Sequence, residues 1–193
     1  MKSLAEQLDA YAAYHADPRN KLTHFVGVPL VSFALFLALG WLRFVHAPEA
    51  PCTGATLFYL VVFLYYLRLD WRLALCQLPF TLPLWWLADR VALWPWRDSV
   101  LVFLATFLGG WVVQLLGHGL EGRRPALADN LLQVFNAPLF LAAEVALLLG
   151  LRQDLRGAVG WKQASGAEPG PRAAGQLERP LPVGPGREID PPQ

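Results

Sequence analysis

The sequence predicts an all-α protein, a polytopic membrane helical bundle with about four to five membrane-embedded helices and a disordered C-terminal tail. Hydrophobic residues make up 55% of the 193 residues and charged residues only 16%, whereas ordinary soluble domains carry about 25% charge. Long apolar segments recur and end at aromatic and cationic side chains. From about Gly157 the composition changes to Gly, Pro, Ala, Arg and Glu, which cannot build a core. We therefore divide the chain into an integral membrane helical domain, residues 1–156, and a disordered Pro/Gly-rich tail, residues 157–193.

Composition also excludes several classes of function. The formal net charge of +1 offers no basic stripe to neutralise a phosphate backbone, so no nucleic-acid partner is expected. Cys52 and Cys76 are too few for a disulfide framework and do not form a CxxC pair. The N-terminal residues lack an apolar core and a small-residue cleavage site, so a secretory signal is not expected.

The first element expected is a short amphipathic helix over residues 3–14. Leu4, Leu8 and Tyr11 recur at helical spacing with polar side chains opposite them, a pattern typical of a helix at the membrane surface. Pro18 then disfavours helix at the preceding residue. Asn20 and His24 follow at a spacing of four, so they share one face of the next helix.

Four apolar segments follow and are interpreted as membrane crossings. The second is short, the third contains two prolines, and a Pro/Gly-containing link separates the first from the second at residues 46–54. The segments are residues 25–42, 55–67, 73–87 and 99–117.

The number of crossings determines which polar groups can meet. Four crossings return the chain to its starting side, so His15, His24, His118 and Glu121 are predicted at one membrane face. Lysine and arginine are more frequent in the links on that side, which makes it the cytoplasmic face by the positive-inside rule. A second and third segment that merged across residues 68–72 would break this parity.

The stretch from Gln114 to Glu144 holds the densest set of reactive groups. His118 and Glu121 are three residues apart and share a helix face if the helix continues. Further on, Asn130, Gln133 and Glu144 fall within a sector of roughly 60° on one helix face. A carboxylate inside an apolar segment costs roughly 2.5 to 3.5 kcal/mol, so we expect a metal, an arginine or a metal-bound histidine to hold Glu144. The segment from Asn130 to Leu151 is long enough to span, but it also suits a re-entrant or buried helix.

Each of these groups has a simpler interpretation. A single interfacial histidine is more often hydrogen-bonded than a ligand, but three that converge with an acid favour a metal, iron or zinc. Arg123 and Arg124 are candidate membrane anchors, and one of them is a candidate partner for a substrate carboxylate. Asn130 is either part of a helix cap or a functional residue.

Two stretches resemble the paired signatures of a known family. They read YHADPRNKLTHFVGVPL, from residue 14, and GHGLEGRRPALADNLLQVFNAPLFLAAE, ending at residue 144. They are similar to the membrane 2-hydroxy fatty acid dioxygenases of phytosphingosine breakdown (fatty acid α-oxidation). The resemblance covers some two thirds of the chain and does not include the tail.

The resemblance implies an Fe(II)-dependent enzyme that converts a 2-hydroxy fatty acid and O2 into CO2 and the fatty acid one carbon shorter. The charge of the links places the expected site at the cytoplasmic face, and the membrane is either a bacterial inner membrane or that of the endoplasmic reticulum. The alternative is a non-catalytic lipid-binding or assembly-factor membrane protein, which would purify without stoichiometric iron. The expected site has iron ligands at His15, His24 and His118, catalytic roles at Glu121, Glu144 and Arg123, and substrate-binding roles at Arg124, Asn130, Gln133 and Asn20.

Overall fold

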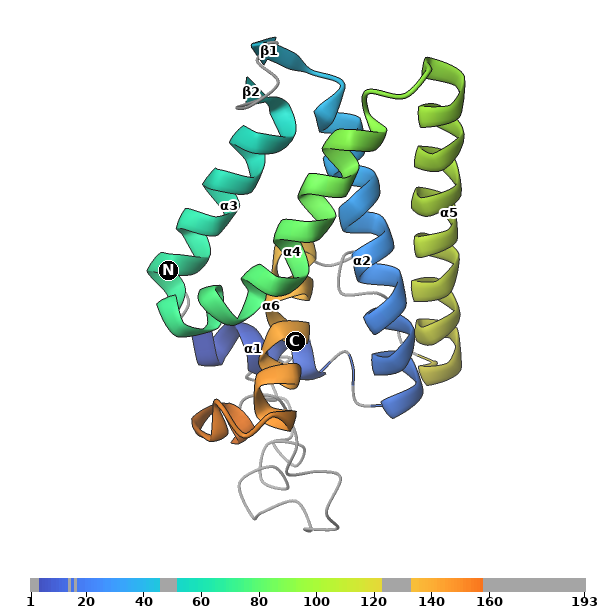
Figure 1. The fold of residues 1–193 in the computed structure, drawn as a ribbon. Helices are drawn as coiled ribbons and strands as arrows, with labels where there is room; N and C mark the ends of the chain where they lie inside the picture. The colour runs from blue at the N-terminus through green and yellow to red at the C-terminus, as the bar shows by residue number, and fades with distance from the viewer. Residues whose placement is uncertain (1–3, 14, 16, 46–51, 123–132, 158–193) are drawn as a thin grey trace, which may run out of the picture. The chain divides into compact units, whose positions relative to one another are not determined.

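The computed structural model describes residues 4–13, 15, 17–45, 52–122 and 133–157, and within this part the chain is mostly helical (Figure 1). The predicted tail lies outside the described residues from residue 158 onward. The helices are α1 (Leu4–Ala13), α2 (Pro18–Gly40), α3 (Gly54–Leu69), α4 (Trp71–Val91), α5 (Trp96–Glu121), α6 (Gln133–Leu148) and the short 3-10 helix η2 (Gln153–Gly157).

The start of α2 places the first site residues inside a helix. Asp17 accepts a hydrogen bond from the backbone N–H of Arg19 at 2.7 Å, and Pro18 occupies the first helical position, where its missing N–H costs nothing. The helix therefore begins seven residues before the predicted crossing at Phe25 and carries both Asn20 and His24. The N-cap at Asp17 sets the start of α2, whereas hydropathy alone identifies only the apolar part of the helix.

The link after α2 contains a short strand pair that hydropathy did not predict. β1 (Arg43–Val45) pairs antiparallel with β2 (Cys52–Thr53). At the same end of the bundle, Trp41 Nε1 donates to Ser99 Oγ at 2.9 Å, and Arg43 pairs with Asp89 at 3.0 Å. These contacts join the residues after α2 to the last turn of α4 and the first turn of α5.

The helices α2 to α5 alternate in direction, so the beginning of α2 and the end of α5 lie at one end of the bundle (Figure 1). The second and third predicted segments do not merge: α3 ends at Leu69, and Asp70 caps α4 by accepting from Leu73 N–H at 2.9 Å. The parity argument is therefore confirmed at the level of the chain path. Pro79 and Pro83 lie inside α4, which bends along its course (Figure 1).

A salt bridge joins the segment after α6 to the turn between α3 and α4. Arg152 donates from both terminal nitrogens to the two oxygens of Asp70, at 2.8 Å each, a bidentate geometry that strengthens the contact. Burial alone would raise the pKa of Asp70, but the hydrogen bonds from Arg152 outweigh it and hold that pKa below its usual value. The contact joins residues that are 82 positions apart in the chain.

Glycines let α2 and α5 approach each other closely. A Cβ at Gly110 would lie 2.8 Å from Val31 Cγ2 and 3.1 Å from the backbone oxygen of Gly27. A Cβ at Gly117 would overlap Thr23 and Asn20. Small residues are typical where two membrane helices bring their backbones together. The close approach brings the polar end of α5 against the first turns of α2.

Two helices in the described part of the chain are long and apolar enough to cross a membrane, namely Pro18–Gly40 and residues 96–120. Only 11% of the apolar window of α5 is buried within the protein, and Leu108, Val112 and Leu116 are among its exposed side chains. Such an apolar surface is consistent with the membrane protein that the composition predicts. The number of four to five embedded helices stays a prediction.

Candidate metal centre

Three histidines from three separate segments converge at the polar end of the bundle. His15 follows α1, His24 lies on α2 and His118 lies on α5, and their side chains are 2%, 3% and 6% exposed. One nitrogen of each ring lies within 4.8 Å of the others. The ring centroids are separated by 4.4 to 5.1 Å. The predicted clustering of these residues is confirmed, and three buried nitrogens this close can hold one metal ion.

The hydrogen bonds of two rings select their tautomers. His15 Nδ1 lies 2.9 Å from the carbonyl oxygen of Tyr11, and His24 Nδ1 lies 2.9 Å from the carbonyl oxygen of Asn20. A carbonyl only accepts, so each Nδ1 carries the proton and each Nε2 of the neutral ring carries a lone pair. The two Nε2 atoms face each other at 3.1 Å. Lone pairs that face each other repel unless a cation or a proton lies beside them, and a metal bound by both removes this repulsion.

Burial keeps His15 in the neutral form that binds metals. Loss of solvation, followed by the neighbouring His24, lowers the pKa of His15 to about 3. A metal therefore does not have to displace a proton from this ring at neutral pH.

Aromatic and amide groups hold the rings in place. Tyr11 stacks on His15 with centroids 4.1 Å apart and planes 7° apart, and Phe140 of α6 packs against Tyr11 at 4.6 Å. The amide Nδ2 of Asn20 lies 3.4 Å from His118 Nδ1. Asn20 thus contacts two ligand candidates, His24 through its carbonyl and His118 through its side chain.

The acid of α6 is held by a lysine. Glu144 is 4% exposed and forms an ion pair with Lys21, Nζ to Oε1 2.5 Å, across 123 positions of the chain. The Lys21 ammonium also lies 5.6 Å from the ring centroid of Phe140. The prediction that a metal, an arginine or a metal-bound histidine holds Glu144 was wrong. The turn of α2 that carries Asn20 also brings Lys21 to α6, so a lysine reaches the carboxylate.

We expect Glu144→Gln to destabilise the protein, because it leaves the Lys21 ammonium partly buried without its counter-charge. The loss should be about 2 kcal/mol of unfolding free energy, less than for a fully buried pair because Lys21 retains some contact with solvent. A cycle with Lys21→Met should give a coupling of about 1 to 3 kcal/mol. Thermal denaturation in detergent measures both quantities. Asp9→Asn changes an exposed acid of α1 and is the control; strict additivity of the cycle would contradict a direct ion pair.

The other predicted site residues fall where side chains are not described. Arg123, Arg124 and Asn130 lie outside the described residues, and Glu121 and Gln133 are placed only as the last residue of α5 and the first of α6. Their roles stay predictions. Sequence reasoning missed Tyr11 and Lys21 as parts of the site. The spacing of four between Tyr11 and His15 was the available signal for Tyr11, whereas Lys21 looked like one more cation of the membrane surface.

Comparison with known proteins shows the family to which the chain belongs. The family model described as Mpo1-like, 2-hydroxy-palmitic acid dioxygenase Mpo1-like, matches residues 1–148. The chain belongs to the Mpo1-like family. It is 32% identical over 155 residues to the 2-hydroxy-palmitic acid dioxygenase MPO1 of Saccharomyces cerevisiae, covering 79% of this chain and 85% of the relative. No solved structure matches the chain.

The Mpo1-like match contains the whole candidate metal centre. It includes all three histidines, Lys21 and Glu144, and it ends at the last residue of α6. Arg152, which ties the end of α6 to the α3–α4 turn, lies beyond the matched residues. The family resemblance drawn from the two sequence signatures is therefore confirmed.

Proposed function

We propose that this protein is an iron-dependent dioxygenase that removes the carboxyl carbon of 2-hydroxy fatty acids within a membrane. The observation that carries the proposal is the pair of His15 and His24 Nε2 atoms, 3.1 Å apart, each on a ring whose Nδ1 is bound to a backbone carbonyl. Membership of the Mpo1-like family, with a relative named as a 2-hydroxy-palmitic acid dioxygenase, supports the substrate class.

The donor set fits a divalent transition metal. Three neutral imidazoles suit iron as well as zinc, and three protein ligands leave positions for substrate and O2. Iron(II) would supply activation of O2 and an anchor for the carboxylate and hydroxyl oxygens of the substrate. The proposed ligands are His15, His24 and His118, and Glu121 remains a candidate to complete or orient the shell.

The surrounding residues have separate tasks in this proposal. Tyr11 and Phe140 cover His15 and exclude water from one side of the site. Asn20 orients two of the rings. The positive charge of Lys21 acts on His15, so the Lys21 ammonium can attract the substrate carboxylate. The same role is proposed for Arg123 or Arg124.

The overall reaction balances without a further reductant. A 2-hydroxy acid and O2 give the shortened acid, CO2 and water. The bond between the carboxyl carbon and the hydroxyl-bearing carbon breaks, and that second carbon becomes the new carboxyl group. The substrate supplies all four electrons that reduce O2. No additional cofactor site is therefore needed for the proposed turnover.

Reconstitution tests the proposal. The purified protein is loaded with Fe(II) without oxygen and then given O2 and 2-hydroxyhexadecanoate labelled at the carboxyl carbon. We expect labelled CO2 and unlabelled pentadecanoate in equal amounts, and no product from hexadecanoate, which lacks the hydroxyl. Iron-loaded, folded protein that forms neither product would contradict the proposal and favour the non-catalytic lipid-binding or assembly-factor alternative. A preparation that never retains metal would favour the same alternative.

A further inference from the structure

The described part of the chain contains an apolar cavity of about 190 Å3 between α2, α4 and α6. Phe25 and Val28 line it from α2, Leu84 from α4, and Leu141 and Val145 from α6. Apolar cavities stay without ordered water and favour apolar ligands. The cavity therefore suits a hydrocarbon.

The lining of the cavity on α2 starts at Phe25, the residue after His24. Val28 is four residues after His24 and so lies on the same face of α2, one turn further from the polar end of the bundle. On α6, Val145 follows Glu144, the partner of Lys21. An acid with its polar head at the histidines can therefore direct its tail along α2 and α6 toward this cavity.

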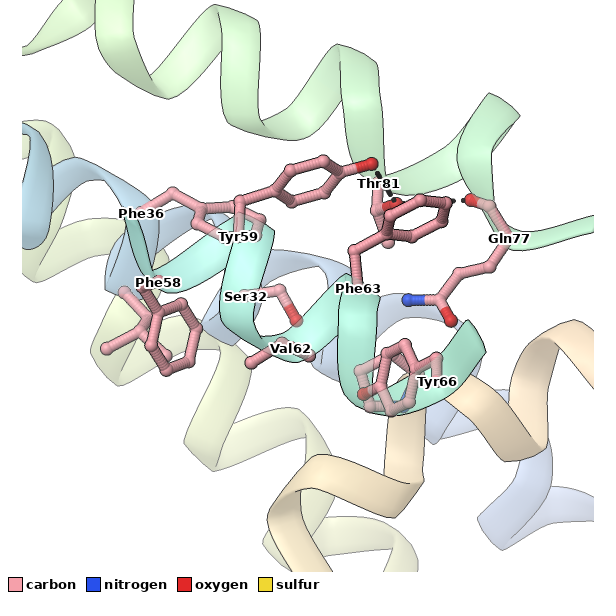
Figure 2. A pocket seen from close by; sticks show the side chains of 11 residues that line it. Ser32, Phe36, Phe58, Tyr59, Val62, Phe63, Tyr66, Gln77 and Thr81 are labelled. Atoms are coloured by element: carbon pink, nitrogen blue, oxygen red, sulfur yellow. Dashed lines mark hydrogen bonds between the residues drawn. The ribbon is translucent and has the colours of Figure 1, made fainter. Parts of the chain in front are cut away.

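A second cavity of about 60 Å3 lies mainly between α2, α3 and α4 and shares lining residues with the first (Figure 2). Both are lined by Ser32, Gln77 and Thr81. Figure 2 shows Tyr59 and Tyr66 of α3 facing Gln77 and Thr81 of α4 across this space. Ser32 is eight residues beyond His24, or about 12 Å along α2.

Pro138 also lines both cavities, and the three polar side chains that they share form a polar collar, defined as Ser32, Gln77 and Thr81. The Thr81 hydroxyl donates to the backbone oxygen of Gln77 at 3.2 Å. The side-chain oxygen Oε1 of Gln77 is buried and accepts no hydrogen bond from the described residues. A hydrocarbon cannot supply the hydrogen bond that this oxygen lacks, so an apolar chain that extends past the collar is disfavoured.

We infer that the larger cavity is the binding site for the hydrocarbon tail of the acid and that the collar at Gln77, which borders the smaller cavity, limits the length of the tail. The inference rests on the proposed function for the identity of the acid. Phe80 of α4 lines the larger cavity and is 50% exposed, so the cavity borders the outer surface of the bundle, where a tail from the bilayer enters.

Photolabelling tests the site without turnover. A fatty acid with a diazirine on its terminal carbon is bound to the metal-loaded full chain and activated by light. We expect labelled peptides from α4 around Gln77 and from α6 around Leu141, with competition by unlabelled 2-hydroxy acid. Labels confined to the outer face of α5 would overturn the inference, as would labelling of the cavity by a phosphatidylcholine probe in preference to the free acid.

A cavity-filling substitution tests the assignment of chain length. Ala142 lines the larger cavity and is buried, whereas Ala105 is exposed on α5. Ala142→Leu should shorten the preferred tail by about three carbons, the number that Leu adds to Ala, and should weaken binding of the longest tails about tenfold. Ala105→Leu should change neither. Identical chain-length profiles for the two variants would overturn the inference.

A substitution at Gln77 tests the role of the polar collar. Gln77 also hydrogen-bonds Tyr66, so Gln77→Leu is compared with its parent in a Tyr66→Phe background, where no buried hydroxyl loses a partner. The leucine should raise the affinity for tails longer than the parent accepts. If the longest tail that binds is the same in both proteins, Gln77 does not limit the length of the tail. Tail binding that maps to the larger cavity in protein that makes no CO2 would leave this site standing and reject the proposed reaction instead.

Discussion

His24→Ala is expected to abolish metal binding and activity while leaving the helices intact. His24 Nε2 faces His15 Nε2 at 3.1 Å, and its ring lies 5.0 Å from that of His118, so its removal takes one of three proposed ligands from the centre. Loss of a group that only orients a ligand costs about 10 to 100-fold in metal affinity. Loss of a ligand should therefore exceed 100-fold. Metal content per folded chain and CO2 release measure the two effects.

Two controls make this result specific. His46, the fourth histidine of the chain, is replaced by Ala as a control for the loss of an imidazole, and we expect full metal content. Asn20→Ala removes the amide beside His118 and should give an intermediate loss within the 10 to 100-fold range. Circular dichroism checks that each variant is helical. A His24→Ala protein that keeps one metal ion per chain would reject the assignment.

Gly110→Ala should disrupt the same centre from a distance. The new Cβ would lie 2.8 Å from Val31 Cγ2, 3.0 Å from Leu30 Cβ and 3.1 Å from the backbone oxygen of Gly27. Backbone cannot rotate away, so α2 and α5 must separate, at a cost of about 1 to 3 kcal/mol. His24 and His118 lie on these two helices, and we expect metal affinity to fall at least about tenfold.

The neighbouring glycine supplies a matched control. A Cβ at Gly109 would meet nothing within 4 Å, so Gly109→Ala makes the same chemical change on the open side of α5. In a helix, alanine is favoured over glycine by about 1 kcal/mol, and this variant should be as stable as the parent or more so. Thermal denaturation and metal titration compare the pair. Equal behaviour of the two variants would mean that the α2–α5 approach does not position the ligands.

Much of the fold and part of the site could be predicted from local sequence. Leu4, Leu8 and Tyr11 recur at helical spacing, which predicts α1 because the side chains of one segment are enough to define an amphipathic face. Pro18 and Asp17 mark the start of α2. The even number of predicted apolar segments between His24 and His118 indicated that both lie at one end of the bundle. Each of these arguments needs only the order of residues along one segment or the number of segments.

Contacts between helices could not be predicted in the same way. Lys21 and Glu144 are 123 positions apart, and Arg152 and Asp70 are 82 apart. Periodicity gives the position of each charge around its own helix, but it does not give the rotation of one helix against another. An arginine or a metal was therefore as reasonable a partner for Glu144 as the lysine that holds it.

The sequence by itself determined that the chain is rich in apolar helices, that three histidines gather at one end, and that the family signatures are present. The tertiary structure alone decided which ring nitrogens face each other, that Lys21 pairs with Glu144, that Gly110 sits against the backbone of α2, and that Gln77 lies between two cavities. The reason is physical. Local propensity and hydropathy act within a segment, whereas ligand geometry depends on the distances and rotations that packing sets between segments.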